Sequence, residues 1–202
     1  SAGKRAMIRA VLKKEFAMRW LAIVGMLWAT QGAAQVTNYE ADGNLESTYD
    51  VGCVVLSALS NAYSPADLAG GVIRCFKDGQ DDRAFEMIVT MQLRTAFDTL
   101  RVEDTTAHQA GQVMMLEIQY AAGEAFGPRM QEAVARFGDS GSPKHSALCA
   151  QMAEFGPPSH SPRYMVQHGM TAFTGREGDG VLDEFDPAES WEMLLEDYLQ
   201  CE

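Results

Sequence analysis

Two cysteines placed symmetrically about a helix-start signal constrain this chain more than any other feature. Ser64-Pro65 combines a capping serine with a proline at the first helical position, and Cys53 and Cys75 lie equally far before and after it. If Ser64 marks the turn between two antiparallel helices, both cysteines stand about 16 Å from the bend. The spacing therefore predicts a helical hairpin, with helices over residues 49–62 and 65–77, closed by a Cys53–Cys75 disulfide.

The remaining two cysteines, Cys149 and Cys201, complete an even count of four. An even number of cysteines behind an export signal predicts two disulfides formed in an oxidising compartment. Because the symmetry pairs Cys53 with Cys75, the second bond is Cys149–Cys201. In the chain-entropy account, closing the two loops stabilises the fold by roughly 3 and 4 kcal/mol. No Cys-x-x-Cys occurs, so neither a thioredoxin-type redox site nor a zinc ribbon is indicated.

Residues 1–34 have the order of a secretory signal peptide. Six basic residues are followed by an apolar run over residues 20–29 and then by the small residues Gly32, Ala33 and Ala34. The apolar run is well short of the roughly 20 residues that span a bilayer. We expect cleavage after Ala34 and a single domain over residues 35–202, periplasmic or secreted, without stable membrane insertion. An uncleaved anchoring helix is the alternative.

Without residues 1–34 the chain is strongly acidic. Residues 35–202 contain 10 basic and 27 acidic residues, a formal charge of −17. A field of that sign repels phosphate backbones and anionic membrane surfaces, so nucleic-acid binding is not expected. It favours a cationic partner, such as a basic protein, a polyamine or a divalent metal ion. The alternative is that the charge only keeps an exported protein soluble.

The rest of the chain has helical patterning and no convincing strand alternation. The expected fold is an all-α, compact bundle of about eight helices with two disulfides. Residues 106–126 form a helix with almost no polar face, which predicts the buried centre of the bundle. The other expected helices cover residues 82–100, 128–137, 143–155 and 162–173, and a final helix begins at Asp186-Pro187.

The most specific local motif is an acidic loop over residues 175–186. Gly180 occupies position 6 of a 12-residue calcium loop, where the chain turns sharply. The loop resembles an EF-hand, and its ending resembles the dockerin variant, although Gly175 replaces the first aspartate. The resemblance implies calcium as cofactor, bound by Glu177, Asp179, the Val181 carbonyl, Asp183 and Asp186. The alternative is a solvated acidic loop that ends in a helix cap.

The sequence contains no motif for hydrolysis or phosphate binding. Gly-x-Ser-x-Gly, His-Glu-x-x-His and phosphate-loop patterns are all missing. We therefore expect an exported, non-enzymatic protein that binds a partner, and an inhibitor or immunity-type protein against a basic toxin is one form of this function. Two alternatives stay open, namely a secreted calcium-binding module that uses the 175–186 loop, and an envelope hydrolase whose paired carboxylates meet only in space.

Overall fold

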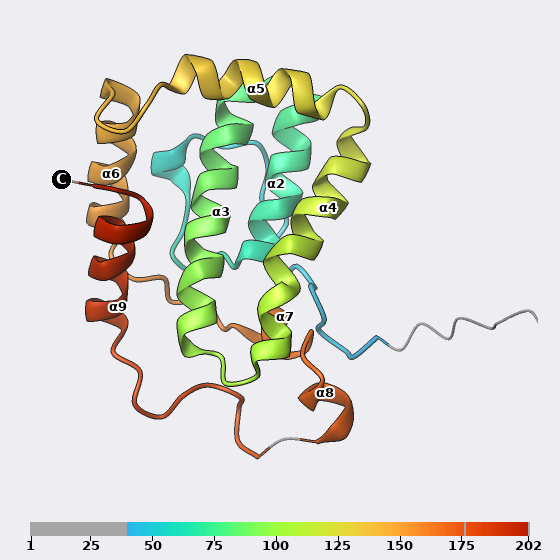
Figure 1. The fold of residues 1–202 in the computed structure, drawn as a ribbon. Helices are drawn as coiled ribbons and strands as arrows, with labels where there is room; N and C mark the ends of the chain where they lie inside the picture. Colours follow the sequence, from blue (N-terminus) through green and yellow to red (C-terminus); the bar gives the residue numbers. More distant parts are fainter. Residues whose placement is uncertain (1–39, 176, 202) are drawn as a thin grey trace, which may run out of the picture. The chain divides into compact units, whose positions relative to one another are not determined.

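The computed structural model describes residues 40–175 and 177–201, so the predicted signal peptide lies outside the described residues. Within them the protein is all-α, as predicted, with eight α-helices (Figure 1). The helices are α2 (Pro65–Lys77), α3 (Asp81–Arg101), α4 (Ala110–Ala122), α5 (Phe126–Phe137), α6 (Pro143–Phe155), α7 (Arg163–Val166), α8 (Thr171–Thr174) and α9 (Pro187–Met193).

Three further helical turns and one isolated bridge lie in the described part. The turns are the 3₁₀ segments η1 (Leu56–Ala58) and η2 (Thr105–Gln109) and the π-helical turn η3 (Leu194–Tyr198), which follows α9. An antiparallel bridge joins Val102 to Val181. A search of the described residues finds no helix long and apolar enough to cross a membrane.

Three of the predicted helix starts are confirmed with their caps. The Ser64 side chain accepts a hydrogen bond from the Asp67 N–H, and the Asp67 side chain accepts one from the Ser64 N–H, which completes a capping box. Ser142 caps α6, and Asp186 caps α9. The predicted helix over residues 162–173 is instead broken into α7 and α8, because the Asp104 carboxylate accepts the Thr171 N–H.

The buried centre is α3, and the prediction that residues 106–126 fill this role is wrong. Nine residues of α3 are buried, against three of α4. On the outer side of α4, Leu116 is 57% exposed and Tyr120 is 92% exposed. The apolar pattern of α4 therefore does not reflect burial on all sides. Helix α3 packs against α2, α5, α9 and η3, and α4 packs mainly against α2 (Figure 1).

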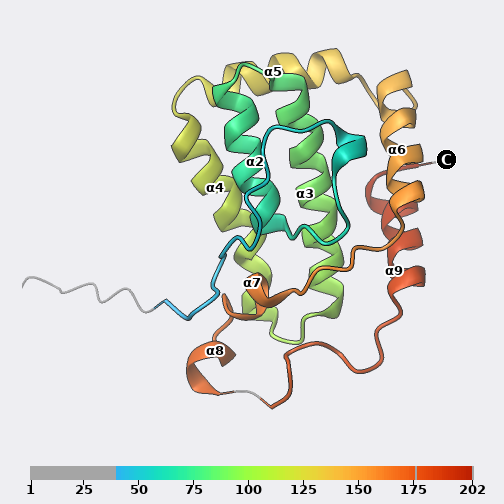
Figure 2. The ribbon, with the colours of Figure 1, turned by 180° about the vertical axis from the view of Figure 1, so that it is seen from behind.

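The predicted helix over residues 49–62 is also wrong. Apart from η1, this segment is irregular and lies along α2 (Figure 2). Two observations explain the difference. The Asp67 carboxylate accepts the N–H groups of Thr48 and Tyr49. The missing side chain of Gly71 lets the Val51 carbonyl approach to 3.2 Å from where a Cβ would stand.

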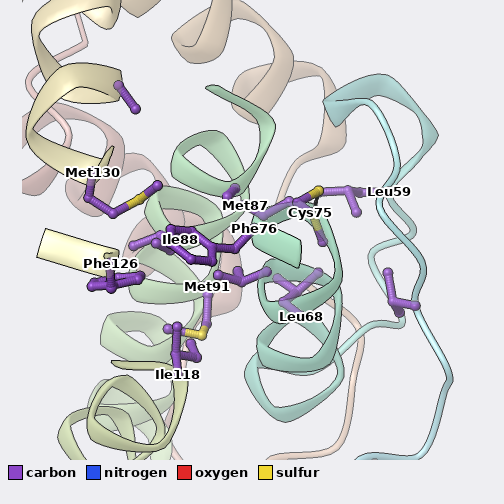
Figure 3. Packing of buried hydrophobic residues seen from close by; sticks show 14 residues of the cluster. Leu59, Leu68, Cys75, Phe76, Met87, Ile88, Met91, Ile118, Phe126 and Met130 are labelled. Carbon is purple, nitrogen blue, oxygen red and sulfur yellow. Dashed lines mark hydrogen bonds between the residues drawn. The ribbon is translucent and has the colours of Figure 1, made fainter. Parts of the chain in front are cut away.

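Both predicted disulfides are present, Cys53–Cys75 and Cys149–Cys201. The first lies in the largest hydrophobic cluster, beside Met87 and Phe76 (Figure 3). The second fastens the end of the chain to α6. Trp191 of α9 packs edge-on against Phe97 of α3 and donates its indole N–H to the Met152 carbonyl. The last helix is thus anchored to the centre of the fold as well as to α6.

Candidate functional site

A stripe of buried charged side chains runs along one face of α3. Arg94, Asp98 and Arg101 follow one another at helical spacings of four and three residues, and the Arg94 and Asp98 residues are 1% and 0% exposed. Arg94 donates hydrogen bonds to the carbonyls of Ser60 and Tyr63. Burial lowers the pKa of Arg94 to about 10, so its guanidinium remains charged at neutral pH. The stripe therefore holds the loop before α2 against α3.

Asp98 organises the second loop that reaches α3, the connection between α6 and α7. Its Oδ1 accepts a hydrogen bond from Arg101, and its Oδ2 accepts one from the Tyr164 hydroxyl at 2.8 Å. The His160 Nε2 lies 2.8 Å from the same Oδ2. Burial, reinforced by the Asp98 charge, raises the pKa of Tyr164 well above its ordinary value. Arg101 also donates to the His160 carbonyl, which fixes the loop.

His160 keeps one ring nitrogen without a partner. Its side chain is 2% exposed, and no described group is hydrogen-bonded to Nδ1. Because the Asp98 carboxylate can only accept, Nε2 carries a proton and donates it to Oδ2. A buried polar atom without a partner costs about 1–3 kcal/mol, and Nδ1 is such an atom.

Asp67 holds the opposite loop in a comparable way. Its Oδ1 accepts the Ser47 hydroxyl and the N–H groups of Thr48 and Tyr49, and its Oδ2 accepts both donors of Ser64. Five donors saturate this carboxylate, which is 1% exposed. Asp67 is therefore committed to positioning residues 47–49 rather than to chemistry.

The two loops enclose a hollow of about 560 Å³. We call it the cleft; its walls are residues 43–49 with 62–67, and residues 159–164. Figure 2 shows both segments on one side of the molecule, with the connection from α6 to α7 running below the segment before α2. The size lies within the range of small-ligand sites. Of the residues around the cleft, the Ser64 cap alone could be recognised in the sequence, because the charged residues of α3 have the pattern of an ordinary solvated face.

Serine, histidine and acidic side chains line the cleft. No serine hydroxyl of the described residues is hydrogen-bonded to the His160 ring, although Ser159 and Ser161 line the hollow. Two carboxylates line it as well. Asp67 is saturated, which leaves Glu46, exposed and without a described partner, as the carboxylate that can act on a bound molecule. A glycosidase-type pair requires two such groups.

The predicted calcium ligands lie in an exposed loop between α8 and α9. Within residues 40–175 and 177–201, no three or more His, Cys, Asp or Glu side chains gather closely enough to hold a metal ion. Two of the carboxylates serve the local backbone, because Asp179 accepts the Val181 N–H and Asp186 accepts the N–H groups of Ala188 and Glu189. Glu177 and Asp183 are exposed. The calcium site stays a prediction.

The same loop begins the most acidic surface of the protein. Residues 177–201 include nine acidic residues and no basic residue, and all nine are exposed. We call residues 177–201 the acidic segment. The acidic side chains are Glu177, Asp179, Asp183, Glu184, Asp186, Glu189, Glu192, Glu196 and Asp197. None of them forms an ion pair with another described residue.

The basic side chains elsewhere are largely neutralised within the fold. Arg101 pairs with Asp98, Arg129 with Asp81, and Arg136 with Asp82. Lys144 also pairs with Asp82, and Arg163 pairs with Asp42. These pairs leave the acidic segment as the dominant charged surface of the described protein.

Comparison with known proteins gives no family and no relative for this arrangement. The chain matches no protein-family model, and no curated protein or solved structure is significantly similar to it.

Proposed function

We propose that this is an exported, non-enzymatic protein that acts by binding a basic protein partner, in the periplasm or outside the cell. An inhibitor or immunity-type protein that neutralises a basic toxin is one form of this function. The two disulfides support export, because such bonds persist in oxidising compartments. The hydrolase alternative is not favoured, because the cleft lacks both a hydrogen-bonded nucleophile and a second free carboxylate.

The observation that carries the proposal is the unpaired charge of the acidic segment. Nine exposed carboxylates over 25 residues, with no cation among them, create a strongly negative local potential. Such a surface accelerates the approach of a basic protein and disfavours acidic ones. A protein that needed charge only for solubility would gain as much from acidic residues spread evenly over its surface.

The acidic segment is also held in place, which favours a binding role. Near the start of the segment, the backbone N–H of Glu103 donates to the Gly180 carbonyl at 3.1 Å, and the backbone N–H of Leu182 donates to the Arg101 carbonyl at 2.8 Å. At its end, the Cys149–Cys201 disulfide ties it to α6. Because the segment is attached to the fold near both of its ends, a partner has to supply less of the free energy of ordering it.

The test is recovery of a partner from envelope extract. The protein is expressed as the full chain, purified from the envelope and immobilised, and captured proteins are identified at low and high salt. We expect a basic protein that is recovered at low salt and lost at high salt, because screening weakens the contact. Recovery of no partner at either salt would contradict the proposal.

A matched pair of variants locates the surface. Glu184→Gln, Glu192→Gln and Glu196→Gln together should reduce the capture, since they remove three charges from the acidic segment without touching a described hydrogen bond. The control removes three exposed charges elsewhere, Glu117→Gln, Glu124→Gln and Glu154→Gln, and should leave the capture close to that of the wild type. Equal loss in both variants would indicate a general charge effect and would overturn the assignment to this surface.

A further inference from the structure

We propose that the Cys149–Cys201 disulfide is a site of thiol–disulfide exchange, and that a dithiol opens it and releases the end of the chain while the rest of the fold stays intact. Three features of the molecule support this, namely the accessibility of the bond, a histidine beside one of its sulfurs and the backbone that carries Cys201. The Cys53–Cys75 disulfide, which lies in the core, provides the comparison within the same molecule.

The two disulfides differ in their access to solvent. Cys75 is 0% exposed within the largest hydrophobic cluster, and Cys53 packs against the same cluster. Cys149 and Cys201 are both partly exposed, and they line a hollow of about 240 Å³. Because exchange begins when a thiolate reaches one of the two sulfurs, the bond that lines a hollow is the one open to attack.

His145 lies one helical turn before Cys149 on α6, close to its sulfur. The Cys149 Sγ is 3.8 Å from Nε2 and 3.9 Å from Nδ1 of the ring. The partners of the ring fix its proton, because the Gly141 N–H can only donate to Nδ1 and the Leu199 carbonyl can only accept from Nε2. The Nε2 proton is therefore used by the chain end, and it becomes available to the Cys149 sulfur when Leu199 moves away.

This arrangement defines the direction of the exchange. A thiolate of the dithiol attacks the Cys201 Sγ, the S–S bond breaks, and its electron pair goes to the Cys149 Sγ, which leaves as a thiolate. The second thiol of the dithiol then displaces Cys201, so the dithiol is oxidised to a disulfide and its two protons end on the two cysteines. A histidine beside a thiolate stabilises the anion, which makes Cys149 the better leaving group.

The backbone that carries Cys201 has an unusual conformation. Gln200 has a φ of +59°, in the left-handed region that residues other than glycine rarely adopt. Before it, α9 passes into the π-helical turn η3, where the Leu199 N–H donates to the Leu194 carbonyl. Both conformations are less favourable than a regular α-helix, so the chain end should relax when the bond opens, and this relaxation favours the open form.

The release is local, because α9 has anchors that do not depend on the disulfide. Trp191 is buried against Phe97 of α3, and Leu194 belongs to the same hydrophobic cluster. The part of the chain set free therefore lies after Leu194, and it carries Glu196 and Asp197 of the acidic segment.

The test compares the two disulfides in the native protein. The full chain, purified from the envelope with both bonds formed, is treated with millimolar dithiothreitol without denaturant, alkylated at intervals and analysed by peptide mass spectrometry. We expect Cys149 and Cys201 to be alkylated about tenfold faster than Cys53 and Cys75, because access governs the rate. Circular dichroism should show that the helices persist, with NMR shifts centred on residues 194–201. Reduction of both bonds at the same rate, or of neither before the protein unfolds, would overturn the proposal.

A pair of variants tests the role of His145. In Cys201→Ser the Cys149 thiol is free, and its reaction with iodoacetamide should reach half its maximal rate well below pH 8.5, which is about the midpoint of an ordinary cysteine. Adding His145→Gln should move the midpoint back to about pH 8.5, because the amide does not carry a positive charge. The control Ser146→Ala, an exposed neighbour that lines the same hollow, should leave the midpoint unchanged. A midpoint that His145→Gln does not move would overturn the direction assigned to the exchange.

One consequence for binding rests on the proposed function. Because the open form frees Glu196 and Asp197, replacing both Cys149 and Cys201 by serine should weaken capture of a basic partner by about fivefold, since the partner then has to order the chain end. Equal capture by this variant and the wild type would overturn that consequence.

The exchange site and the proposed function fail in different ways. If both disulfides resist dithiothreitol equally while a basic partner is captured, the exchange site is wrong and the proposed function stands. If Cys149–Cys201 is reduced first while no partner is recovered at either salt, the exchange site stands and the proposed function is wrong.

Discussion

The His160 Nε2 and the Asp98 Oδ2 lie 2.8 Å apart, although the two residues are 62 positions apart in the chain. This contact joins the central helix α3 to the loop that forms one wall of the cleft. Tyr164 and Arg101 donate hydrogen bonds to the same carboxylate. Asp98 therefore positions both His160 and Tyr164, which lie near the two ends of that wall. The cleft therefore depends on one side chain that lies behind it and does not face the hollow.

Asp98→Asn should destabilise the protein by about 3 kcal/mol, because it leaves the Arg101 charge without its buried partner. The variant also turns one acceptor position into a donor that faces Tyr164 and His160. Urea unfolding followed by circular dichroism measures the loss, and NMR shifts at residues 159–164 report on the wall. The neighbouring exposed residue supplies the control, since Glu103→Gln should change the free energy of unfolding little. A loss below 1 kcal/mol would mean that the network does not hold the wall.

The features that could be predicted from the sequence are local ones. A serine or aspartate followed by proline satisfies the first free N–H groups of a helix within a few residues, so the starts of α2, α6 and α9 are readable at Ser64, Ser142 and Asp186. The disulfide pairing was also correct, although the helical hairpin from which it was argued is absent. The segment before Ser64 is irregular apart from η1, and it still brings Cys53 to Cys75.

The features that could not be predicted depend on contacts between distant segments. Residues 49–62 have helical spacing, but the Asp67 carboxylate and the space at Gly71 fix an irregular chain instead. The cleft was missed for the same reason. Asp98, Arg94 and His160 are polar residues whose burial depends on which loops cover α3, and no local pattern distinguishes them from a solvated face.

The two adjacent glycines of α2 should respond in opposite ways to alanine. Gly70 is exposed with nothing within 4 Å of a new Cβ, so Gly70→Ala should raise the free energy of unfolding by about 0.5–1 kcal/mol through helix propensity. At Gly71 a Cβ would meet the Met87 methyl group in the core and the carbonyls of Val51 and Gly52. Gly71→Ala should lower the stability by about 1 kcal/mol. Thermal unfolding of the two variants measures both effects, and each variant is the control for the other. Stabilisation by both substitutions would show that the segment beside α2 is not closely packed against it.

Acid should remove the contribution of the Asp104 carboxylate to the free energy of unfolding. Burial alone would raise the pKa of this carboxyl, but hydrogen bonds from the Thr106 hydroxyl and from the N–H groups of Thr171 and Thr106 outweigh it and lower the pKa to about 2. A carboxyl with a lowered pKa stabilises the fold above its ordinary pKa of 3.8, and the effect is lost as the pH falls toward 2.

Asp104→Asn should therefore cost about 1 kcal/mol at pH 6, because both oxygens of Asp104 accept hydrogen bonds and the amide nitrogen of asparagine cannot replace one of them, and progressively less below pH 4. Denaturant unfolding of both proteins from pH 6 to pH 2 measures the difference. Glu103→Gln provides a baseline, because the Glu103 side chain forms no hydrogen bond with another described residue. A difference between wild type and Asp104→Asn that is independent of pH would rule out the stabilising role of the charge.

Asp186 allows the cap and the calcium hypothesis to be separated. Its carboxylate accepts the N–H groups of Ala188 and Glu189, so Asp186→Ala should lower the free energy of unfolding by about 1 kcal/mol in the absence of metal. Asp186→Asn should keep most of the stability, because asparagine is an equally good cap. Since Asp179 and Asp186 already bind backbone N–H groups, we expect no heat when millimolar calcium is titrated into the wild type. A saturable heat that Asp183→Asn abolishes would instead establish the 175–186 loop as a calcium site, because Asp183 has no described role in the fold.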